Sequence, residues 1–312
     1  MRGTAFAHLP PGLIVFDQNR STKVKFQQIP RSLFVVSVNF LKRLSMPSDT
    51  SSTRLTHVLD GHVATITINR AHKRNAINSG MWRHLSEIIK EIESNSTIRL
   101  IVVTGNGPDF SAGADISEFE DLRSNAEGAR DYDRVTEAAY DGLRECPIPT
   151  LAAIQGSCMG GGLGLAMSCD LRIATPNARF AIPAGRLGLA YPVKSLVHLT
   201  GIVGPAVAKD LLFTARRYDA PDALRAGLLT EICEGSLEDE IEKFSRQITA
   251  NAPLTLKASK AVINTLTDAK SAISGLDFSV ALDRVQACYS SLDYVEGRVA
   301  FLAKRTPDFQ GK

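Results

Sequence analysis

No apolar stretch in the chain reaches the ~20 residues that a membrane-spanning helix requires. The longest candidate, residues 33–41, is too short and is interrupted by Ser37 and Asn39. Hydrophobic residues make up 44% of the sequence and charged residues 22%, which is the balance of a folded globular protein. We therefore expect a globular protein that has no membrane partner.

Cysteine is scarce as well. The chain has five cysteines, scattered along its length: Cys146, Cys158, Cys169, Cys233 and Cys288. Their odd number excludes a complete set of intrachain disulfides, and no CxxC or Cys/His cluster has the spacing of metal ligands. We expect free thiols in a reducing compartment and no bound metal.

Acidic residues are nearly missing from residues 1–45, which hold seven basic side chains and only Asp17. This segment carries a net charge of +6, so the rest of a chain whose total is +3 carries −3. Because the folded body is not basic, we expect no nucleic-acid partner. The segment is either a mitochondrial transit peptide or precedes a true start at Met46. Residues 1–52 are assigned to an extension, and the protein to the cytoplasm, or to the mitochondrial matrix if the extension is a transit peptide.

From residue 55 onward, short β-type runs alternate with helical patterns. Strands are predicted at 56–59, 63–68, 99–104, 150–155, 171–174 and 228–233, and helices at 81–92, 161–167 and 206–213. Ser79 is the predicted N-cap of the first helix, and the continuous apolar run 99–104 is typical of a strand buried on both faces. Beyond residue 236 only helical patterns follow, at 237–250, 253–268, 275–291 and 293–304. This predicts an α/β core over 53–235 with parallel pairing and an all-helical region over 236–312.

Two glycine-rich segments, residues 105–115 and 156–164, each connect a predicted strand to a helix. Glycine lets the backbone approach a ligand closely, and a helix N-terminus offers unpaired N–H groups. Two such turns from neighbouring strands can direct two amides at one oxygen, as in an oxyanion hole. The alternative is that the glycines only permit tight packing of helix on sheet. Neither segment is a Walker loop or a dinucleotide-binding fingerprint.

Several motifs together resemble the enoyl-CoA hydratase/isomerase, or crotonase, superfamily. They are NRAHKRNAIN (69–78), FSAGADISEF (110–119), AAIQGSCMGGGLGLAMSCDLRIA (152–174), FAIPAGRLGL (180–189) and AFLAKRTPDFQGK (300–312). The resemblance implies a crotonase-type α/β spiral of ββα units, followed by a C-terminal helical region that packs homotrimers, often stacked as hexamers. It also implies an acyl-CoA substrate and no further cofactor.

The resemblance also implies roles for individual residues. The oxyanion amides fall on Ala114 and Gly161. The coenzyme A contacts fall on Lys73, Arg74, Ala76, Ala112, Asp115 and Ile116, and those that reach the coenzyme A of a neighbouring subunit fall on Phe301 and Lys304. Cys158, in the second glycine segment, is expected to line the pocket rather than act as a nucleophile.

The acid/base residues of the superfamily are missing. The two glutamates that hydratases use are replaced by Gly164 and Ala184, and a third acidic position used by other members holds Pro192. Hydration requires one group to accept a proton and one to donate it, so ordinary hydratase activity is not expected. Tyr191 instead resembles a tyrosine of methylmalonyl-CoA decarboxylase, although the threonine near that enzyme's reacting carboxylate is replaced by Pro183.

Three hypotheses follow for the activity. The first is an enolate-forming enzyme, a lyase or isomerase that decarboxylates or isomerises an acyl-CoA, with Tyr191 in the acyl pocket. The second is a hydratase with a different acid/base group, and the third is a catalytically inactive acyl-CoA-binding protein. Residues 118–145 are expected to shape the acyl pocket, but they contain no motif that identifies the acyl group.

Overall fold

The computed structural model describes residues 54–267 and 290–308. Residues from 52 onward form one compact unit, to which all the elements below belong. The predicted extension 1–52 and most of the predicted helix 275–291 lie outside the described residues.

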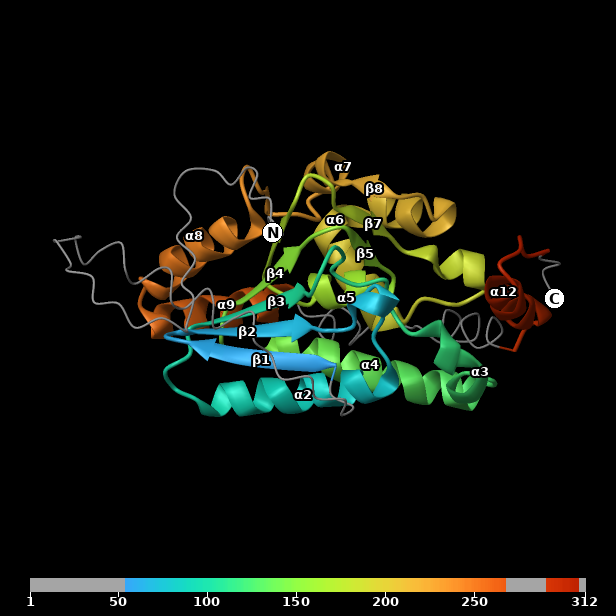
Figure 1. Ribbon diagram of the computed structural model, residues 1–312, viewed down its shortest axis with the longest axis horizontal. Helices are drawn as coiled ribbons and strands as arrows, with labels where there is room; N and C mark the ends of the chain where they lie inside the picture. The colour runs from blue at the N-terminus through green and yellow to red at the C-terminus, as the bar shows by residue number, and fades with distance from the viewer. Residues whose placement is uncertain (1–53, 268–289, 309–312) are drawn as a thin grey trace, which may run out of the picture. The chain divides into compact units, whose positions relative to one another are not determined.

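A six-stranded sheet forms the centre of this unit (Figure 1). Its strands, in spatial order, are β1 (Leu55–Asp60), β2 (Val63–Ile68), β3 (Leu100–Gly105), β4 (Thr150–Ile154), β6 (Leu171–Ala174) and β9 (Glu231–Ile232). β1 and β2 pair antiparallel across a tight turn in which Gly61 has a φ of +57°. All the other pairs in this sheet are parallel. The predicted α/β class is confirmed, whereas the predicted strand 228–233 is reduced to the two residues of β9.

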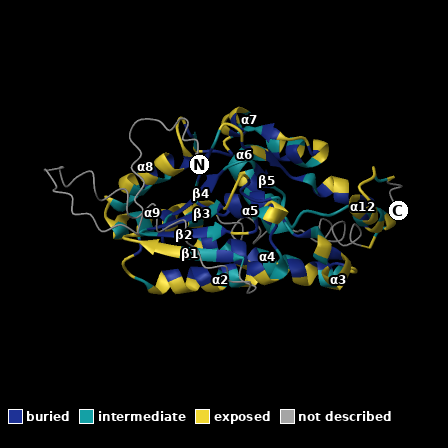
Figure 2. Cartoon of the chain, in the orientation of Figure 1, coloured by how far each residue is buried: buried dark blue, intermediate teal, exposed yellow. Residues whose placement is uncertain are grey.

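Strand β3 is buried on both faces, as its continuous apolar run predicts (Figure 2). Ile101 and Val103 belong to the larger hydrophobic core, and Leu100 and Val102 to a second core on the opposite face. Helices therefore cover both faces of the sheet. The second core is closed by α8 (Leu237–Thr249).

Helices α2 (Ser79–Ser94) and α4 (Ala126–Glu145) pack against each other on the side of the larger core (Figure 1). The prediction that Ser79 caps α2 was wrong. The N-cap is Asn78, whose side-chain oxygen accepts a hydrogen bond from the Met81 amide at 2.8 Å. An asparagine one residue earlier satisfies the same unpaired amides of the first turn. Helix α9 (Pro253–Thr267) packs against α4.

A second, three-stranded sheet and several short elements lie around the glycine segments. They are β5 (Ser157–Met159), β7 (Arg179–Ala181), β8 (Tyr218–Asp219), α3 (Phe119–Leu122), α5 (Gly161–Met167), α7 (Ala220–Arg225), η2 (Ala71–Lys73), η3 (Ile116–Glu118) and η4 (Pro183–Leu187). α5 has the bounds predicted from the sequence. The strands of the small sheet are too short to give a periodic pattern.

Helix α6 (Val193–Thr214) is longer than the predicted helix 206–213. It is long and apolar enough to cross a membrane by length and composition. However, Gly204 has non-helical backbone angles (φ 73°, ψ 165°) and Pro205 follows it. Neither half therefore approaches the ~20 helical residues that a span requires. The second half corresponds to the predicted helix, and the first half carries residues of the candidate site.

Helix α12 (Leu292–Leu302) packs on η4 and completes the described part of the helical C-terminal region. A β-carbon on Gly297 would lie 2.4 Å from the carbonyl oxygen of Leu187, so the two backbones touch. The Tyr294 hydroxyl donates a hydrogen bond to the carbonyl oxygen of Arg123 at 2.9 Å. Because Leu187 and Arg123 both line the cavity described below, α12 supports its wall.

Candidate active site

The two glycine segments meet, as expected for turns that leave adjacent parallel strands. Gly113 has a φ of +102°, and a β-carbon there would lie 2.7 Å from the carbonyl oxygen of Met159. Only glycine satisfies both the backbone angle and the close approach. Ala114 and Gly161 are consequently neighbours, since a β-carbon on Gly161 would lie 3.4 Å from the Ala114 nitrogen.

The amides of Ala114 and Gly161 are available for a ligand. Among the residues that the structure describes, neither N–H group donates a hydrogen bond, and both residues line the same cavity. Gly161 is the first residue of α5, so its amide is one of those that a helix leaves unpaired. Two adjacent unpaired donors in the wall of one cavity can hold a single oxygen on which negative charge develops.

The cavity lies between the glycine segments, α4, η4 and the start of α6. Its wall comprises Trp82, Ala112, Gly113, Ala114, Ile116, Phe119, Arg123, Tyr132, Asp133, Thr136, Tyr140, Gly160, Gly161, Ile182, Pro183, Ala184, Leu187, Leu189, Tyr191, Pro192 and Ser195. Most of these side chains are apolar or aromatic, with a few polar groups among them. This composition is typical of a site for a small organic ligand.

Aromatic rings and one ion pair give the cavity a fixed shape. Trp82 and Tyr140 pack edge to face with their ring centres 5.4 Å apart, and the Trp82 indole donates to the Tyr132 hydroxyl at 3.3 Å. Arg123 and Asp133 form an ion pair at 2.7 Å. The Arg123 guanidinium also lies 5.0 Å from the centre of the Tyr132 ring. These contacts hold the side chains of α4 in place around the ligand space.

Tyr140 fills the space in which a side chain at position 164 would lie. A β-carbon on Gly164 would lie 2.6 Å from the Tyr140 hydroxyl oxygen, and this hydroxyl donates to the Gly161 carbonyl oxygen at 2.8 Å. The absence of a glutamate at 164 is therefore matched by a bulky residue on α4. Ala184 and Pro192 do line the cavity, but neither titrates.

Tyr191 lies in the cavity wall, next to Pro192 and Leu189. It lies just after the 3₁₀ turn η4 and just before α6. Burial raises the pKa of the Tyr191 hydroxyl, and the nearby carboxyl of Glu137 raises it further. The hydroxyl thus remains protonated near neutral pH and can donate a hydrogen bond.

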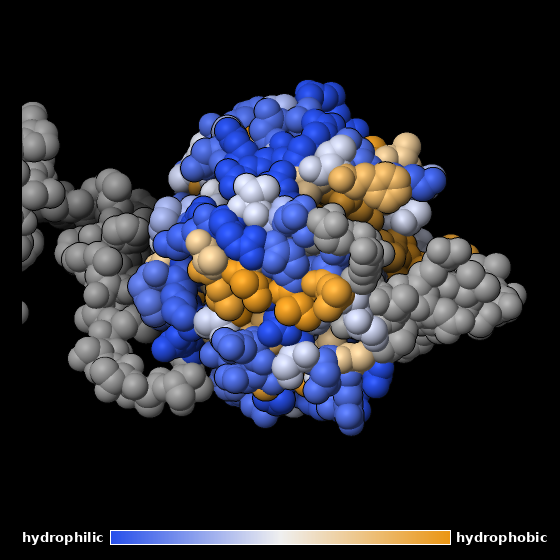
Figure 3. Space-filling model, turned by 90° about the vertical axis from the view of Figure 1, so that its right-hand side faces the viewer, coloured by the Kyte–Doolittle hydropathy of each residue, from blue (hydrophilic) through white to orange (hydrophobic). Residues whose placement is uncertain are grey.

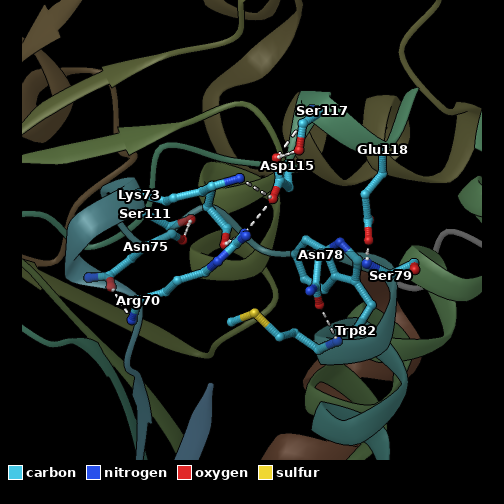
Figure 4. A network of polar contacts seen from close by, with 12 residues as sticks. Arg70, Lys73, Asn75, Asn78, Ser79, Trp82, Ser111, Asp115, Ser117 and Glu118 are labelled. Carbon is cyan, nitrogen blue, oxygen red and sulfur yellow. Dashed lines mark hydrogen bonds and ion pairs between the residues drawn. The ribbon is translucent and has the colours of Figure 1, made fainter. Parts of the chain in front are cut away.

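A buried ion pair holds the loop that carries Ala114 (Figure 4). The Arg70 guanidinium lies 2.5 Å from Asp115 Oδ2 and also donates to the Ala76 carbonyl oxygen at 3.1 Å. Burial alone would raise the pKa of Asp115, but hydrogen bonds from Ser117 and Arg70 outweigh it and hold this pKa at about 2. The Asp115 carboxylate is thus engaged within the protein.

The residues expected to contact coenzyme A lie at different places. Ala112 and Ile116 line the cavity. The amine of Lys73 is 3.5 Å from Asp115 (Figure 4), and the exposed Arg74 side chain pairs with Asp109 at 2.9 Å. Phe301 and Lys304 are exposed near the end of α12 and are not part of the cavity wall.

The cysteines described by the structure are free and buried. Cys158 does not line the cavity, contrary to expectation; it lies in the hydrophobic core, and burial raises the pKa of its thiol. Among the described residues, no group of three or more His, Cys, Asp or Glu side chains is placed to hold a metal.

Residues 118–145 contribute to the cavity wall, as expected, but sequence reasoning singled out no residue on α4 and missed the first turn of α6. Tyr132, Thr136 and Tyr140 face the cavity from α4, and Ser195 faces it from α6. The spacing of four residues between the three α4 positions places them on one helix face, which is a signal that the sequence contains.

A mostly parallel sheet, flanked by helices and with paired glycine turns beside an apolar cavity, is the arrangement of a crotonase-type fold. The chain belongs to the enoyl-CoA hydratase/isomerase family, whose model matches residues 59–312. Enzymes of this family act on coenzyme A thioesters without an additional cofactor.

Relatives with different activities are similar to this chain. The short-chain-enoyl-CoA hydratase of Clostridium acetobutylicum is 35% identical over 79% of this chain and 93% of its own. Among solved structures, an enoyl-CoA hydratase/carnithine racemase from Magnetospirillum magneticum has a TM-score of 0.68 at 35% identity, covering 84% of this chain and 97% of its own. Methylmalonyl-CoA decarboxylase in complex with 2-nitronate-propionyl-CoA has a TM-score of 0.77 at 29% identity, covering 84% and 100%.

Proposed function

We propose that the chain is an acyl-CoA enzyme that stabilises a thioester enolate with the amides of Ala114 and Gly161. The observation that carries this proposal is the adjacency of the two N–H groups on one cavity wall, with no hydrogen-bond acceptor among the described residues. Two preorganised donors stabilise the charge that develops on the thioester oxygen when an electron pair moves into it.

Decarboxylation of a malonyl-type thioester is the reaction that we favour. The bond between the α-carbon and the carboxylate breaks, carbon dioxide leaves, and the electron pair forms the enolate. This step needs no acid or base at positions 164, 184 and 192, which hold Gly164, Ala184 and Pro192. The structural likeness to methylmalonyl-CoA decarboxylase supports the assignment.

Tyr191 is proposed to orient the departing carboxylate. Its hydroxyl stays protonated and its ring lies in the cavity wall, so it can donate to a carboxylate held perpendicular to the thioester plane. In that orientation the breaking bond overlaps the carbonyl π system. Fixing the geometry of a reacting group in this way lowers the barrier by several kcal/mol.

We expect Tyr191→Phe to reduce decarboxylation of a malonyl-type thioester by roughly tenfold or more, because the orienting hydrogen bond is lost. Thermal stability and affinity for the thioester should change little, since the ring is retained. Tyr218→Phe is the matched control, because it removes the hydroxyl of a buried tyrosine that donates to Asp210 away from the cavity. Equal losses of stability and activity in the Tyr191 variant would instead assign Tyr191 to the core.

A non-catalytic acyl-CoA-binding protein is the second candidate, because the three acid/base positions of the superfamily do not titrate. Such a protein would bind acyl-CoA thioesters but would convert none of them to product. In both cases we propose that Lys73, Arg74, Ala76, Ala112, Asp115 and Ile116 lie along the bound coenzyme A. A hydratase with another acid/base group would be revealed by hydration of crotonyl-CoA.

We also propose that the chain forms homotrimers, alone or stacked as hexamers. The face that carries α12 shows an apolar area near its centre (Figure 3). Its exposed hydrophobic side chains on α12 include Leu292, Val295, Val299, Phe301 and Leu302. Contiguous exposed apolar surface of this kind marks interaction sites. In such an assembly Phe301 and Lys304 would reach the coenzyme A of a neighbouring subunit.

The bacterial relatives favour the cytoplasm as the location of the protein.

A further inference from the structure

Ser195 connects the cavity to a buried carboxyl group. It lies in the first turn of α6 and lines the cavity together with Tyr191 and Pro192. Its hydroxyl donates to Glu137 Oε1 at 2.5 Å. Glu137 lies on α4, and only 11% of its side chain is exposed. A buried carboxylate needs partners, and here one of them is a hydroxyl on the cavity wall.

Further ion pairs extend from Glu137 toward the surface. Arg144 lies 3.4 Å from Glu137 Oε2 and also pairs with Asp141. The amine of Lys194 in turn lies 3.0 Å from Asp141 Oδ2. The exposed fraction of the side chains rises along this series, from 11% at Glu137 through 16% and 25% to 40% at Lys194. A polar connection thus joins the cavity wall to solvent.

The groups around Glu137 favour its role as a proton donor and acceptor. Burial raises the pKa of Glu137, while the hydrogen bond from Ser195 and the charge of Arg144 oppose this and Asp141 adds to it. Tyr140 and Tyr191 are close enough for the Glu137 charge to raise their own pKa values. On α6, burial lowers the pKa of His198 to about 4, so this imidazole is neutral. A carboxyl whose pKa lies nearer neutrality exchanges protons more effectively in catalysis.

We propose that Ser195 and Glu137 form a proton relay to the α-carbon of the bound thioester, an inference that rests on the proposed function. After decarboxylation, the enolate electron pair forms a C–H bond with the Ser195 hydroxyl proton as that O–H bond breaks. For this step Glu137 is the neutral acid and its O–H donates to Ser195, in the reverse sense of the hydrogen bond described above. Ser195 takes this proton as it releases its own to the α-carbon, and the resulting Glu137 carboxylate recovers a proton from solvent. In reverse, the same relay removes a proton from a saturated acyl group. In this relay Ser195 contacts the reacting carbon. Glu137 does not contact the carbon and acts only through Ser195.

Exchange of α-hydrogens tests the relay without assuming the natural substrate. With propionyl-CoA in D₂O, the wild-type protein should exchange one of the two α-hydrogens, followed by mass spectrometry and NMR. Ser195→Ala and Glu137→Gln should each lower the exchange rate by roughly a hundredfold or more, the usual cost of losing a general acid/base. Glu137→Gln retains the size of the side chain, and melting temperature and propionyl-CoA affinity should stay at wild-type values.

Glu240→Gln is the matched control, because Glu240 is also buried and ion-paired but lies on α8, outside the cavity wall. It should exchange at the wild-type rate. Wild-type exchange in either relay variant would overturn the relay, as would wild-type protein that binds propionyl-CoA without exchanging a hydrogen. Failure of the wild-type protein to bind any coenzyme A thioester would overturn the proposed function instead.

Discussion

Replacing Gly161 with proline is expected to lower thioester turnover by roughly a hundredfold or more, the usual cost of one oxyanion donor. Proline has no N–H group, so the variant loses one of the two unpaired amides in the cavity wall. Gly161 is the first residue of α5, a position at which helices accept proline. The fold should therefore survive, and turnover with melting temperature measured in parallel will separate the two effects.

Gly161→Ala is the matched control for this variant. It keeps the N–H group, and its β-carbon would lie 3.4 Å from the Ala114 nitrogen, the Trp82 ring and the Tyr140 hydroxyl. These are contacts that small shifts accommodate, so we expect a loss of less than about tenfold, well below that of the proline variant. Equal turnover in the proline variant and the wild-type protein would contradict the assignment of Gly161 as an oxyanion donor.

Restoring the first hydratase glutamate alone, as Gly164→Glu, should not produce hydration of crotonyl-CoA. The β-carbon would lie 2.6 Å from the Tyr140 hydroxyl oxygen, so the new side chain and the phenol cannot occupy the same space. Overpacking of a core in this way costs roughly 1–3 kcal/mol. We therefore expect a lower melting temperature. The absorbance of the enoyl thioester, which falls on hydration, should decrease no faster than with the wild-type protein.

Removing the Tyr140 side chain should allow introduced glutamates to support hydration of crotonyl-CoA. Tyr140→Ala combined with Gly164→Glu and Ala184→Glu opens the space and supplies both carboxyl groups. Since one general acid or base contributes about 10²–10⁴ in rate, even partial positioning should raise hydration above the wild-type level. The Tyr140→Ala single variant controls for the enlarged cavity. Hydration by Gly164→Glu alone would contradict the view that Tyr140 excludes a glutamate from this site.

The elements that the sequence predicts well are those with a clear period. Strand β2 alternates, the run of β3 is continuously apolar, and α2 repeats its apolar residues at helical spacing, so tertiary packing agrees with local pattern. The paired glycine segments likewise suggest that two turns meet, and the family resemblance names Ala114 and Gly161, which the structure brings together. There, a backbone constraint rather than side-chain chemistry determines the geometry.

The rest of the candidate site depends on contacts that no local pattern encodes. Glu137 and Ser195 are 58 positions apart in the chain, and only the packing of α4 against α6 brings their side chains together. Tyr140 resembles an ordinary aromatic residue until Gly164 is seen to lie against its hydroxyl. The first half of α6 was missed because Gly204 and Pro205 interrupt the pattern ahead of the predicted helix.

The most direct test of the proposed enolate chemistry is a turnover assay of the wild-type protein on a panel of acyl-CoAs. The panel should include crotonyl-CoA, malonyl-CoA and methylmalonyl-CoA, with Gly161→Pro as the blank and products identified by mass spectrometry. We expect decarboxylation of a malonyl-type thioester and a rate of crotonyl-CoA hydration that is lower by orders of magnitude, because Gly164 and Ala184 supply no carboxyl group. Rapid hydration of crotonyl-CoA, with the malonyl-type thioesters left intact, would contradict the proposal that the protein is a decarboxylase.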